Sequence, residues 1–139
     1  MGVTFAEIKV GSSWDRKELS DLWGYHSFHA FGRGVFTPKN DNKIVLFIKE
    51  EKRDEDEQYE DHLAGHLLYW HGEKGHGSDR RIADAQVNGD EIHVFYRLTH
   101  REPFRYLGRA VTKKFELLTK QPSRFTFELL NPPRKDGEA

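Results

Sequence analysis

The chain has 139 residues, enough for one domain with a single hydrophobic core and too few for two ordinary domains. Aromatic residues make up 13% of the sequence, so a folded domain is expected in spite of a charged content of 32%. The absence of cysteine excludes a disulfide scaffold, a thiol nucleophile and a zinc ribbon. We expect one folded domain over residues 1–131, followed by a flexible tail over residues 132–139.

The sequence contains no candidate for a membrane span. No apolar stretch approaches the roughly 20 residues that a helix needs to cross a bilayer. The first residues also lack an apolar run of signal-peptide length. We therefore expect a soluble, cytoplasmic protein without a membrane partner.

The small net charge of −1 hides an uneven distribution. Residues 50–61 carry eight acids and two bases, a local charge of −6 that leaves +5 for the rest of the chain. Acidic blocks of this kind typically form solvated loops. A modestly basic body with one acidic loop is compatible with a surface that binds nucleic acid.

A short strand over residues 4–10 and one amphipathic helix are expected at the start of the chain. Asp15 lies in the first helical turn, where the helix dipole favours an acid, and Gly24 provides a stop. Residues 25–36, rich in aromatic side chains and glycine, indicate a bent strand. We expect them to pair as a hairpin with residues 44–48, IVLFI, which read as a strand buried on both faces.

The second half of the chain is more regular. The Asn88-Gly89 pair between two apolar runs is a strong short-range signal for a hairpin. A second short helix is expected over residues 113–118. Short strands joined by tight turns favour an α+β fold that is mainly antiparallel β, with a curved sheet or partly open β-barrel and one or two short helices. The predicted strands of this half cover residues 67–70, 82–87, 92–98, 104–111 and 125–130.

Histidine spacing raises the hypothesis of a metal site, and neighbouring residues argue against it. His62 and His66 stand four residues apart, as two ligands on one helical face would. Gly65 disfavours a helix there, the following residues resemble a strand, and no HExxH signature is present. We therefore predict no metal and no cofactor, and we treat the histidines as surface or structural residues.

Two other functions stay open as alternatives. Asp41, Glu50 and Lys52 follow the order of the motif with which restriction-type nucleases hold Mg²⁺, so a small Mg-dependent nuclease is one alternative. This pattern is short and arises easily by chance in a charged chain. A protein-interaction domain that docks a basic partner through the acidic residues 54–57 is the other alternative.

Aromatic residues interleaved with arginines favour a nucleic-acid surface, because rings stack on bases and arginines contact phosphates. Most of the aromatic residues are nevertheless needed for the core of so small a domain. The set consists of Trp23, Tyr25, Phe28, Phe31, Tyr59, Tyr69 and Trp70, with Arg33, Arg80, Arg81, Arg101, Arg105 and Arg109 nearby in the sequence.

Several fragments, taken in order, resemble a known domain family. They are Trp23-Gly24-Tyr25, Tyr59-Glu60-Asp61, Trp70 at the end of a strand, IHVFYR at residues 92–97 and FRYLGR at residues 104–109. Residues 19–130 are similar to a domain of unknown function found at the C-terminal end of modification-dependent (type IV) restriction helicases that carry a phospholipase-D-like nuclease. The same domain occurs beside HNH nucleases.

The resemblance implies a fold similar to the SET-and-RING-associated (SRA) domain, a curved barrel that flips a modified base into an aromatic-lined pocket. It also implies a function, the recognition of 5-methylcytosine or a related modified cytosine in double-stranded DNA. The chain would be the non-catalytic specificity module of a restriction system. A partner nuclease or helicase domain or subunit would supply the cutting.

The resemblance also implies roles for particular residues. Tyr25, Tyr59 or Trp70 would stack on the flipped base, and Asp61 would accept a hydrogen bond from the cytosine amino group. The sequence departs from the family pattern in its acidic insert and at His71-Gly72. Residues 67–70 would anchor the barrel, and residues 72–81 would form a loop that reaches DNA. The predicted contacts to the DNA backbone are Arg33, Lys74, Arg80, Arg81 and Arg105.

Overall fold

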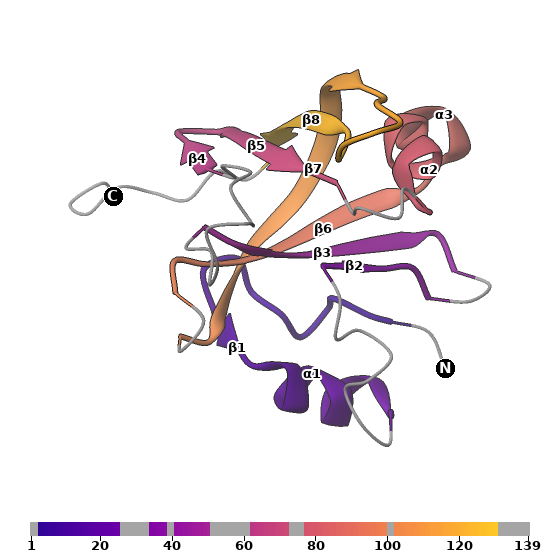
Figure 1. Cartoon of the computed structure of the whole chain (residues 1–139). Helices are drawn as coiled ribbons and strands as arrows, with labels where there is room; N and C mark the ends of the chain where they lie inside the picture. Colours follow the sequence, from indigo (N-terminus) through magenta and orange to yellow (C-terminus); the bar gives the residue numbers. More distant parts are fainter. Residues whose placement is uncertain are drawn as a thin grey trace.

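The computed structural model describes residues 3–25, 34–38, 41–50, 62–72, 77–99 and 102–130. In this part of the chain, eight strands form one curved sheet in the order β2-β3-β6-β7-β8-β5-β4, and β1 pairs with β7 off this path (Figure 1). Three short helices accompany the sheet. The elements are β1 (Ser13–Trp14), α1 (Arg16–Trp23), β2 (Val35–Phe36), β3 (Lys43–Lys49), β4 (His62–Ala64), β5 (Leu67–His71), α2 (Asp79–Ala83), α3 (Ala85–Asn88), β6 (Glu91–Arg97), β7 (Phe104–Glu116) and β8 (Arg124–Leu129).

The pairing of the strands confirms the predicted fold class. Every pair is antiparallel except β3 with β6, which run in the same direction. The sheet curves without closing, because β2 and β4 stand at its two ends. The predicted pairing of residues 25–36 with β3 is confirmed at Val35–Phe36, and residues 26–33 lie outside the described part of the chain.

The sheet curls around an inner core. Residues of β3 and β5 stand near opposite ends of the strand order, yet they share one buried cluster with residues of β6 and β8. Leu46 of β3 and Leu68 of β5 are both fully buried in it. This arrangement gives the molecule the shape of a half-barrel, which Figure 1 shows as β4, β5 and β8 folded over β6 and β3.

An outer core covers the other face of the sheet. The chain before α1 and α1 itself pack there against aromatic side chains of β3, β6 and β7. α1 forms where it was expected and ends at Gly24, which has a φ of 78°. Asp15 is the cap of the helix and not a residue of its first turn as predicted, and it forms a reciprocal capping box with Glu18. Leu19 and Trp23 of this helix are buried, and the Trp23 indole donates to the Thr4 carbonyl at 2.9 Å.

The predicted strand over residues 82–87 and its hairpin are wrong, because these residues form α2 and α3. Ile82 and Ala85 are buried in the inner core from one helical face. Gly89 has a φ of 78° and ends α3, and its amide donates to the Ala85 carbonyl. An Asn-Gly pair suits a helix end as well as a hairpin turn, since both need a left-handed residue.

Two further predictions at the ends of elements are also wrong. The helix expected over residues 113–118 is largely the end of β7, which continues to Glu116 and pairs with β8. Residues 4–10 contain turns and no strand, although Ile8 is buried in the outer core. None of the helices in the described segments is both long and apolar enough to span a membrane.

The two ends of the half-barrel differ. At one end α2 and α3 pack against β7 and β6, and the Thr112 hydroxyl donates to the Ile82 carbonyl at 2.8 Å. Arg81 of α2 connects the segments that precede β3 and β6 at this end. Its guanidinium contacts the Asp90 carboxylate at 3.0 and 3.2 Å and the Asp41 carbonyl at 3.0 Å. The strands β3 and β6 start here and finish together at the opposite end, where the Glu50 amide donates to the Arg97 carbonyl at 3.0 Å.

Candidate nucleic-acid interface

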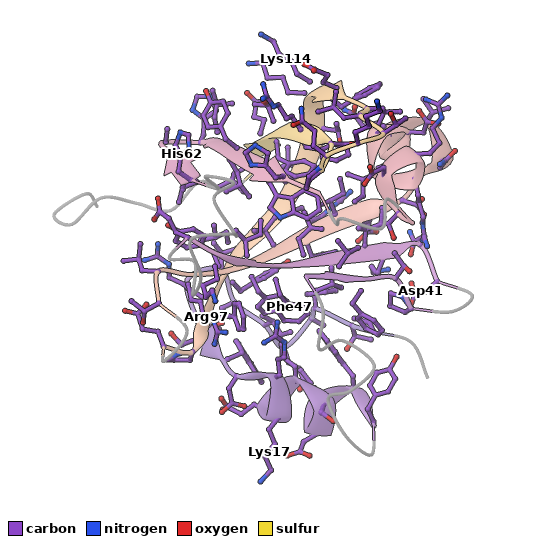
Figure 2. The ribbon with its side chains drawn as sticks, in the orientation of Figure 1. Lys17, Asp41, Phe47, His62, Arg97 and Lys114 are labelled. Carbon is purple, nitrogen blue, oxygen red and sulfur yellow. The ribbon has the colours of Figure 1, made fainter. Side chains whose placement is uncertain are left out.

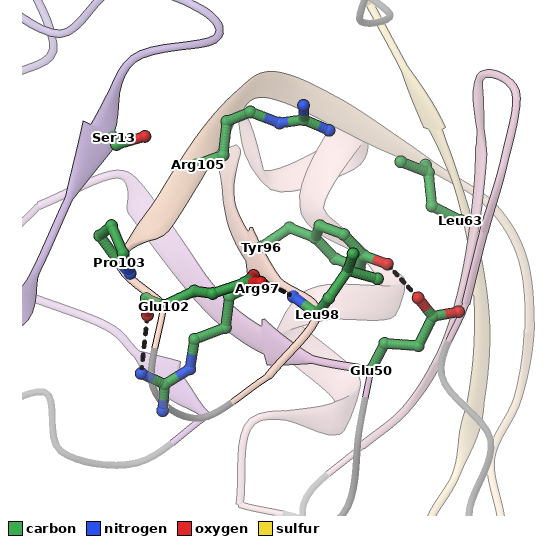
Figure 3. Close-up of a pocket in the computed structure, with 9 residues that line it drawn as sticks. All are labelled: Ser13, Glu50, Leu63, Tyr96, Arg97, Leu98, Glu102, Pro103 and Arg105. Carbon is green, nitrogen blue, oxygen red and sulfur yellow. Dashed lines mark hydrogen bonds between the residues drawn. The ribbon is translucent and has the colours of Figure 1, made fainter.

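A cavity of about 540 Å³ opens at the end of the half-barrel where β3 and β6 finish (Figure 3). We call it the mouth cavity. Its volume lies within the roughly 300–1,000 Å³ that is usual for pockets that bind small molecules. Six separate parts of the fold meet there, namely β1, the end of β3, β4, the end of β6, the turn after it and the start of β7. The lining residues are Ser13, Glu50, Leu63, Tyr96, Arg97, Leu98, Glu102, Pro103 and Arg105.

A tyrosine and a glutamate form the polar centre of the mouth cavity. The Tyr96 hydroxyl donates a hydrogen bond to the Glu50 carboxylate, as Figure 3 shows. Tyr96 is 6% exposed, and its burial together with this hydrogen bond raises the pKa of its hydroxyl well above the usual value. The hydroxyl therefore stays protonated at neutral pH and acts as a fixed donor. It holds the carboxylate on the cavity wall, where the second oxygen of Glu50 can accept a hydrogen bond from a ligand.

Arg105 and Leu63 complete the inner lining. Arg105 lies opposite Tyr96 in the register between β7 and β6, so the two side chains share a face of the sheet. Leu63 comes from β4, at the far end of the strand order. In Figure 3 both side chains lie above the Tyr96–Glu50 pair, Arg105 towards the left of the view and Leu63 towards the right. The cavity thus offers a hydrogen-bond acceptor, a cation and apolar surface within one opening.

The structure does not bring together the two described members of the predicted base pocket. Trp70 is 5% exposed in the inner core, with its ring 5.6 Å from Phe125 and 5.9 Å from Phe127. Tyr25 packs against the outer core, 5.8 Å from Phe36. Trp70 and Tyr25 therefore lie on opposite faces of the sheet.

The other two predicted pocket residues, Tyr59 and Asp61, lie outside the described residues. In the sequence they stand between Glu50 and Leu63, which both line the mouth cavity. The acidic residues 54–57, through which an interaction domain would dock, also lie outside the described part of the chain.

The described members of the predicted DNA-backbone set are spread over both ends of the molecule. Arg105 lines the mouth cavity. Arg81 is engaged with Asp90 at the opposite end, and Arg80 lies on the surface there with its nitrogen 3.7 Å from Asp84. Arg33 and Lys74 lie outside the described residues.

The residues of the alternative nuclease motif do not meet. Asp41 precedes β3 and Glu50 follows it, so a strand that spans about 20 Å separates the two carboxylates. Figure 2 shows Asp41 at the opposite end of the strands from Arg97, which neighbours Glu50. Lys52 lies outside the described residues.

His62 and His66 do not share a helix. His62 belongs to β4 and stacks on Tyr69 at 4.7 Å, whereas His66 lies 3.4 Å from Glu128. Within the described segments, no group of three or more His, Asp or Glu side chains is placed to hold a metal ion.

Sequence reasoning missed most of the mouth cavity, above all Glu50, Tyr96 and Leu63. Two signals were present. Glu50 is the first acid after a buried strand, and Tyr96 falls on the inward positions of the alternating pattern in β6. The pattern alone does not show that these positions face each other, because β3 and β6 are distant in sequence and pair in parallel.

Comparisons with known proteins identify the fold. No protein-family model and no curated protein matches the chain. Solved structures do match, and they show that the fold is that of SRA domains, as the resemblance predicted.

Three solved structures illustrate the likeness. The SRA domain of SUVH5 in complex with hemi-methylated CG DNA covers 97% of this chain and 98% of its own, with a TM-score of 0.67 and 15% identity. The same domain bound to fully hydroxymethylated CG DNA has a TM-score of 0.65, 13% identity and the same coverage. The DNA modification-dependent restriction endonuclease AspBHI covers 73% of this chain and 64% of its own, with a TM-score of 0.51 and 16% identity.

Proposed function

We propose that this chain is a DNA-binding domain that recognises modified cytosine, 5-methylcytosine or a related base, in duplex DNA. The observation that carries the proposal is the mouth cavity in an SRA fold, with the Glu50 carboxylate held on its wall by Tyr96. The SUVH5 domains that share the fold are in complexes with methylated and with hydroxymethylated CG DNA.

Base flipping is the way in which we propose that the cavity is used. Extracting a base from the duplex costs a few kcal/mol of stacking and pairing, so contacts between the base and the cavity have to offset that cost. A carboxylate accepts a hydrogen bond from the amino group of cytosine, and Glu50 is placed for that role. Burial of one methyl group adds about 0.8 kcal/mol, so apolar contact alone favours the methylated base by about fourfold.

Tyr59 and Asp61 remain part of the proposal as base contacts. They are joined in sequence to Glu50 and Leu63, which line the cavity. A tyrosine ring would stack on the flipped base, and a second carboxylate would read the same polar edge. Arg105 would contact the DNA backbone at the rim of the cavity.

We propose further that the domain is the specificity module of a restriction system and has no catalytic residue of its own. A nuclease or helicase domain or subunit would cut the DNA, and the system would act in the cytoplasm. The described structure supports this division of labour in one respect, because Asp41 and Glu50 are too far apart to share a metal ion.

The test is a binding titration with matched duplexes that differ only in one 5-methylcytosine. We expect tighter binding to the modified duplex, and weaker binding to that duplex in Glu50→Gln, because a neutral amide is a weaker acceptor for the amino group. Glu116→Gln is the matched control, since Glu116 is exposed at the far end of β7. Equal affinity of the unaltered chain for both duplexes would overturn the proposal.

A further inference from the structure

A second, smaller hollow lies beside the mouth cavity on the outer face of the sheet. We call it the arginine hollow; its volume is about 240 Å³. Residues at the start of α1 form one side of it, and the end of β6 with the start of β7 forms the other. Arg97 lines this hollow and the mouth cavity as well. The lining residues are Asp15, Arg16, Lys17, Arg97 and Phe104.

The position of Arg97 follows from the strand that carries it. Tyr96 and Arg97 are the last two residues of β6, and neighbouring strand residues point to opposite faces of a sheet. Tyr96 therefore faces the mouth cavity, and the Arg97 side chain lies over the Phe104 ring in the outer core, 4.2 Å from its centroid. Figure 3 shows the Arg97 side chain leading away from Tyr96. The end of one strand thus separates the two hollows.

Arg97 forms no ion pair with any of the described residues. Its Nη1 donates to the backbone carbonyl of Glu102 at 3.3 Å, and its buried Nε donates to none of the described residues. The Glu102 carboxylate contributes a favourable charge at longer range, and it accepts a hydrogen bond from the Leu98 amide. Arg97 consequently keeps donor capacity for a ligand with several acceptor oxygens.

A second guanidinium, that of Arg16, reinforces this positive site. It lies 4.9 Å from the Phe47 ring and 4.9 Å from the Phe104 ring, so Phe104 contacts both arginines (Figure 2 shows Arg97, Phe47 and Lys17 in this region). Burial, and next the charge of Arg97, lower the pKa of Arg16 to about 10. The aromatic faces offset part of the repulsion between these cations.

Among the described residues, Asp15 is the carboxylate that lines the arginine hollow, and it already serves the fold. Asp15 accepts a hydrogen bond from the Glu18 amide at 2.7 Å, as the cap of α1. Lys17 also lines the hollow, but it is exposed and its side chain points away from Arg97 in Figure 2. Among the described residues, the hollow therefore combines two guanidinium groups with one carboxylate that serves the helix, an arrangement suited to an anion with several oxygens.

We propose that the arginine hollow binds a phosphodiester phosphate of DNA, within one nucleotide of the base that occupies the mouth cavity. The inference rests on the function proposed above. A phosphate and its base are joined through one sugar, so the sites that bind them have to be neighbours. The arginine hollow and the mouth cavity meet this requirement, because Arg97 lines both. Two guanidinium groups match the geometry of phosphate oxygens, which a single ammonium group does not.

The experiment uses the whole chain and a duplex with one 5-methylcytosine, in which single phosphates are replaced by uncharged methylphosphonate linkages. For the unaltered chain we expect the linkages on either side of the 5-methylcytosine to weaken binding about tenfold, and remote linkages to have less effect. In Arg97→Gln, binding to the ordinary duplex falls about tenfold and the slope of log affinity against log salt changes by about 1. The flanking methylphosphonates then cause no further loss.

The matched control is Arg124→Gln, because Arg124 is exposed at the start of β8 and pairs in register with Glu116 at the far end of β7. If Arg97→Gln does not fold by circular dichroism, Arg16→Gln enters the same comparison, and the linkage scan of the unaltered chain needs no variant at all. Uniform sensitivity to linkage position, or additive losses from variant and linkage, overturns the phosphate site. Failure of the proposed function appears differently, as equal affinity for methylated and plain duplexes.

Discussion

Tyr96 belongs to the inner core and to the mouth cavity at the same time. Its ring is buried with the apolar side chains of β6, while its hydroxyl reaches the Glu50 carboxylate at the cavity wall. A single side chain therefore couples the packing of the half-barrel to the position of the acceptor. Removing the hydroxyl alone separates these two contributions.

Tyr96→Phe should weaken binding to the methylated duplex several-fold and change the free energy of unfolding by only about 1 kcal/mol. The ring stays in place, but Glu50 loses the donor that orients it. Binding titrations and urea unfolding measure the two effects. Tyr106→Phe is the control, since its hydroxyl contacts His93 on the outer face. Equal losses of affinity in both variants would contradict the assignment of Glu50.

His93 makes the stability of the domain sensitive to mild acid. It is 3% exposed, stacks on Phe5 at 3.6 Å, and contacts the Tyr106 hydroxyl at 2.6 Å and Glu91 at 3.0 Å. Burial lowers the pKa of His93 to about 4, although Glu91 acts in the opposite direction. Because the unfolded chain takes up the proton near pH 6.5, stability is complete above that pH and declines as the pH falls towards 4.

Urea unfolding should show a loss of about 2 kcal/mol between pH 7 and pH 5 that depends on His93. His93→Gln removes the titrating group and should flatten this decline, whatever its effect on stability at pH 7. The comparison of the two slopes cancels the contribution of the carboxylates. A decline of the same size in the variant would show that His93 is not its origin.

At the scale of the elements, those that could be predicted are the ones whose apolar pattern or end residues lie within one short stretch of sequence. β3 and β6 are continuous or alternating apolar runs, and α1 has a cap at Asp15 and a stop at Gly24. The apolar residues Ile82 and Val87 suit a strand pattern, but the structure buries Ile82 together with Ala85, three residues on, as a helical spacing does and an alternating strand does not. The mouth cavity could not be predicted from the sequence, because it depends on the parallel pairing of β3 with β6 and on the position of β4 at the far edge of the sheet.

The glycine that departs from the family pattern joins β5 to α2. A Cβ added at Gly72 would lie 2.9 Å from the Asp79 carboxylate and 3.2 Å from the Phe125 ring. Asp79 is 7% exposed and accepts a hydrogen bond at 2.6 Å from the buried Ser123 hydroxyl. The residues around this buried hydrogen bond therefore leave no room for a side chain at Gly72.

Gly72→Ala should lower the free energy of unfolding by roughly 1–3 kcal/mol, because the methyl group displaces Asp79 from its hydrogen bond or strains the chain. Gly77→Ala is the matched control, since no atom of the described residues lies within 4 Å of the added carbon there. Denaturant unfolding of the two variants gives the comparison. Similar stabilities would mean that Asp79 moves aside at little cost.

At the scale of the whole molecule, the two hollows of the proposed DNA-binding site lie at one end. Four cations line the two adjoining hollows there, Arg16, Lys17, Arg97 and Arg105. If each neutralises one phosphate, log affinity for duplex DNA should fall with log salt at a slope of about −3 to −4. Titrations over a range of salt concentrations measure this slope. A slope near zero would contradict binding through this end of the domain.

The clamp of Arg81 on Asp90 and on the Asp41 carbonyl stands at the other end of β3 and β6, about 20 Å from the mouth cavity. Contacts at this separation are energetically independent, so substitutions at the two ends should add without interacting. Substitutions of cavity residues during evolution could therefore change which modified base is bound, while the contacts of Arg81 at the opposite end keep the domain folded. The same independence makes the helical end the place to stabilise the domain for engineering, with its ligand preference left intact.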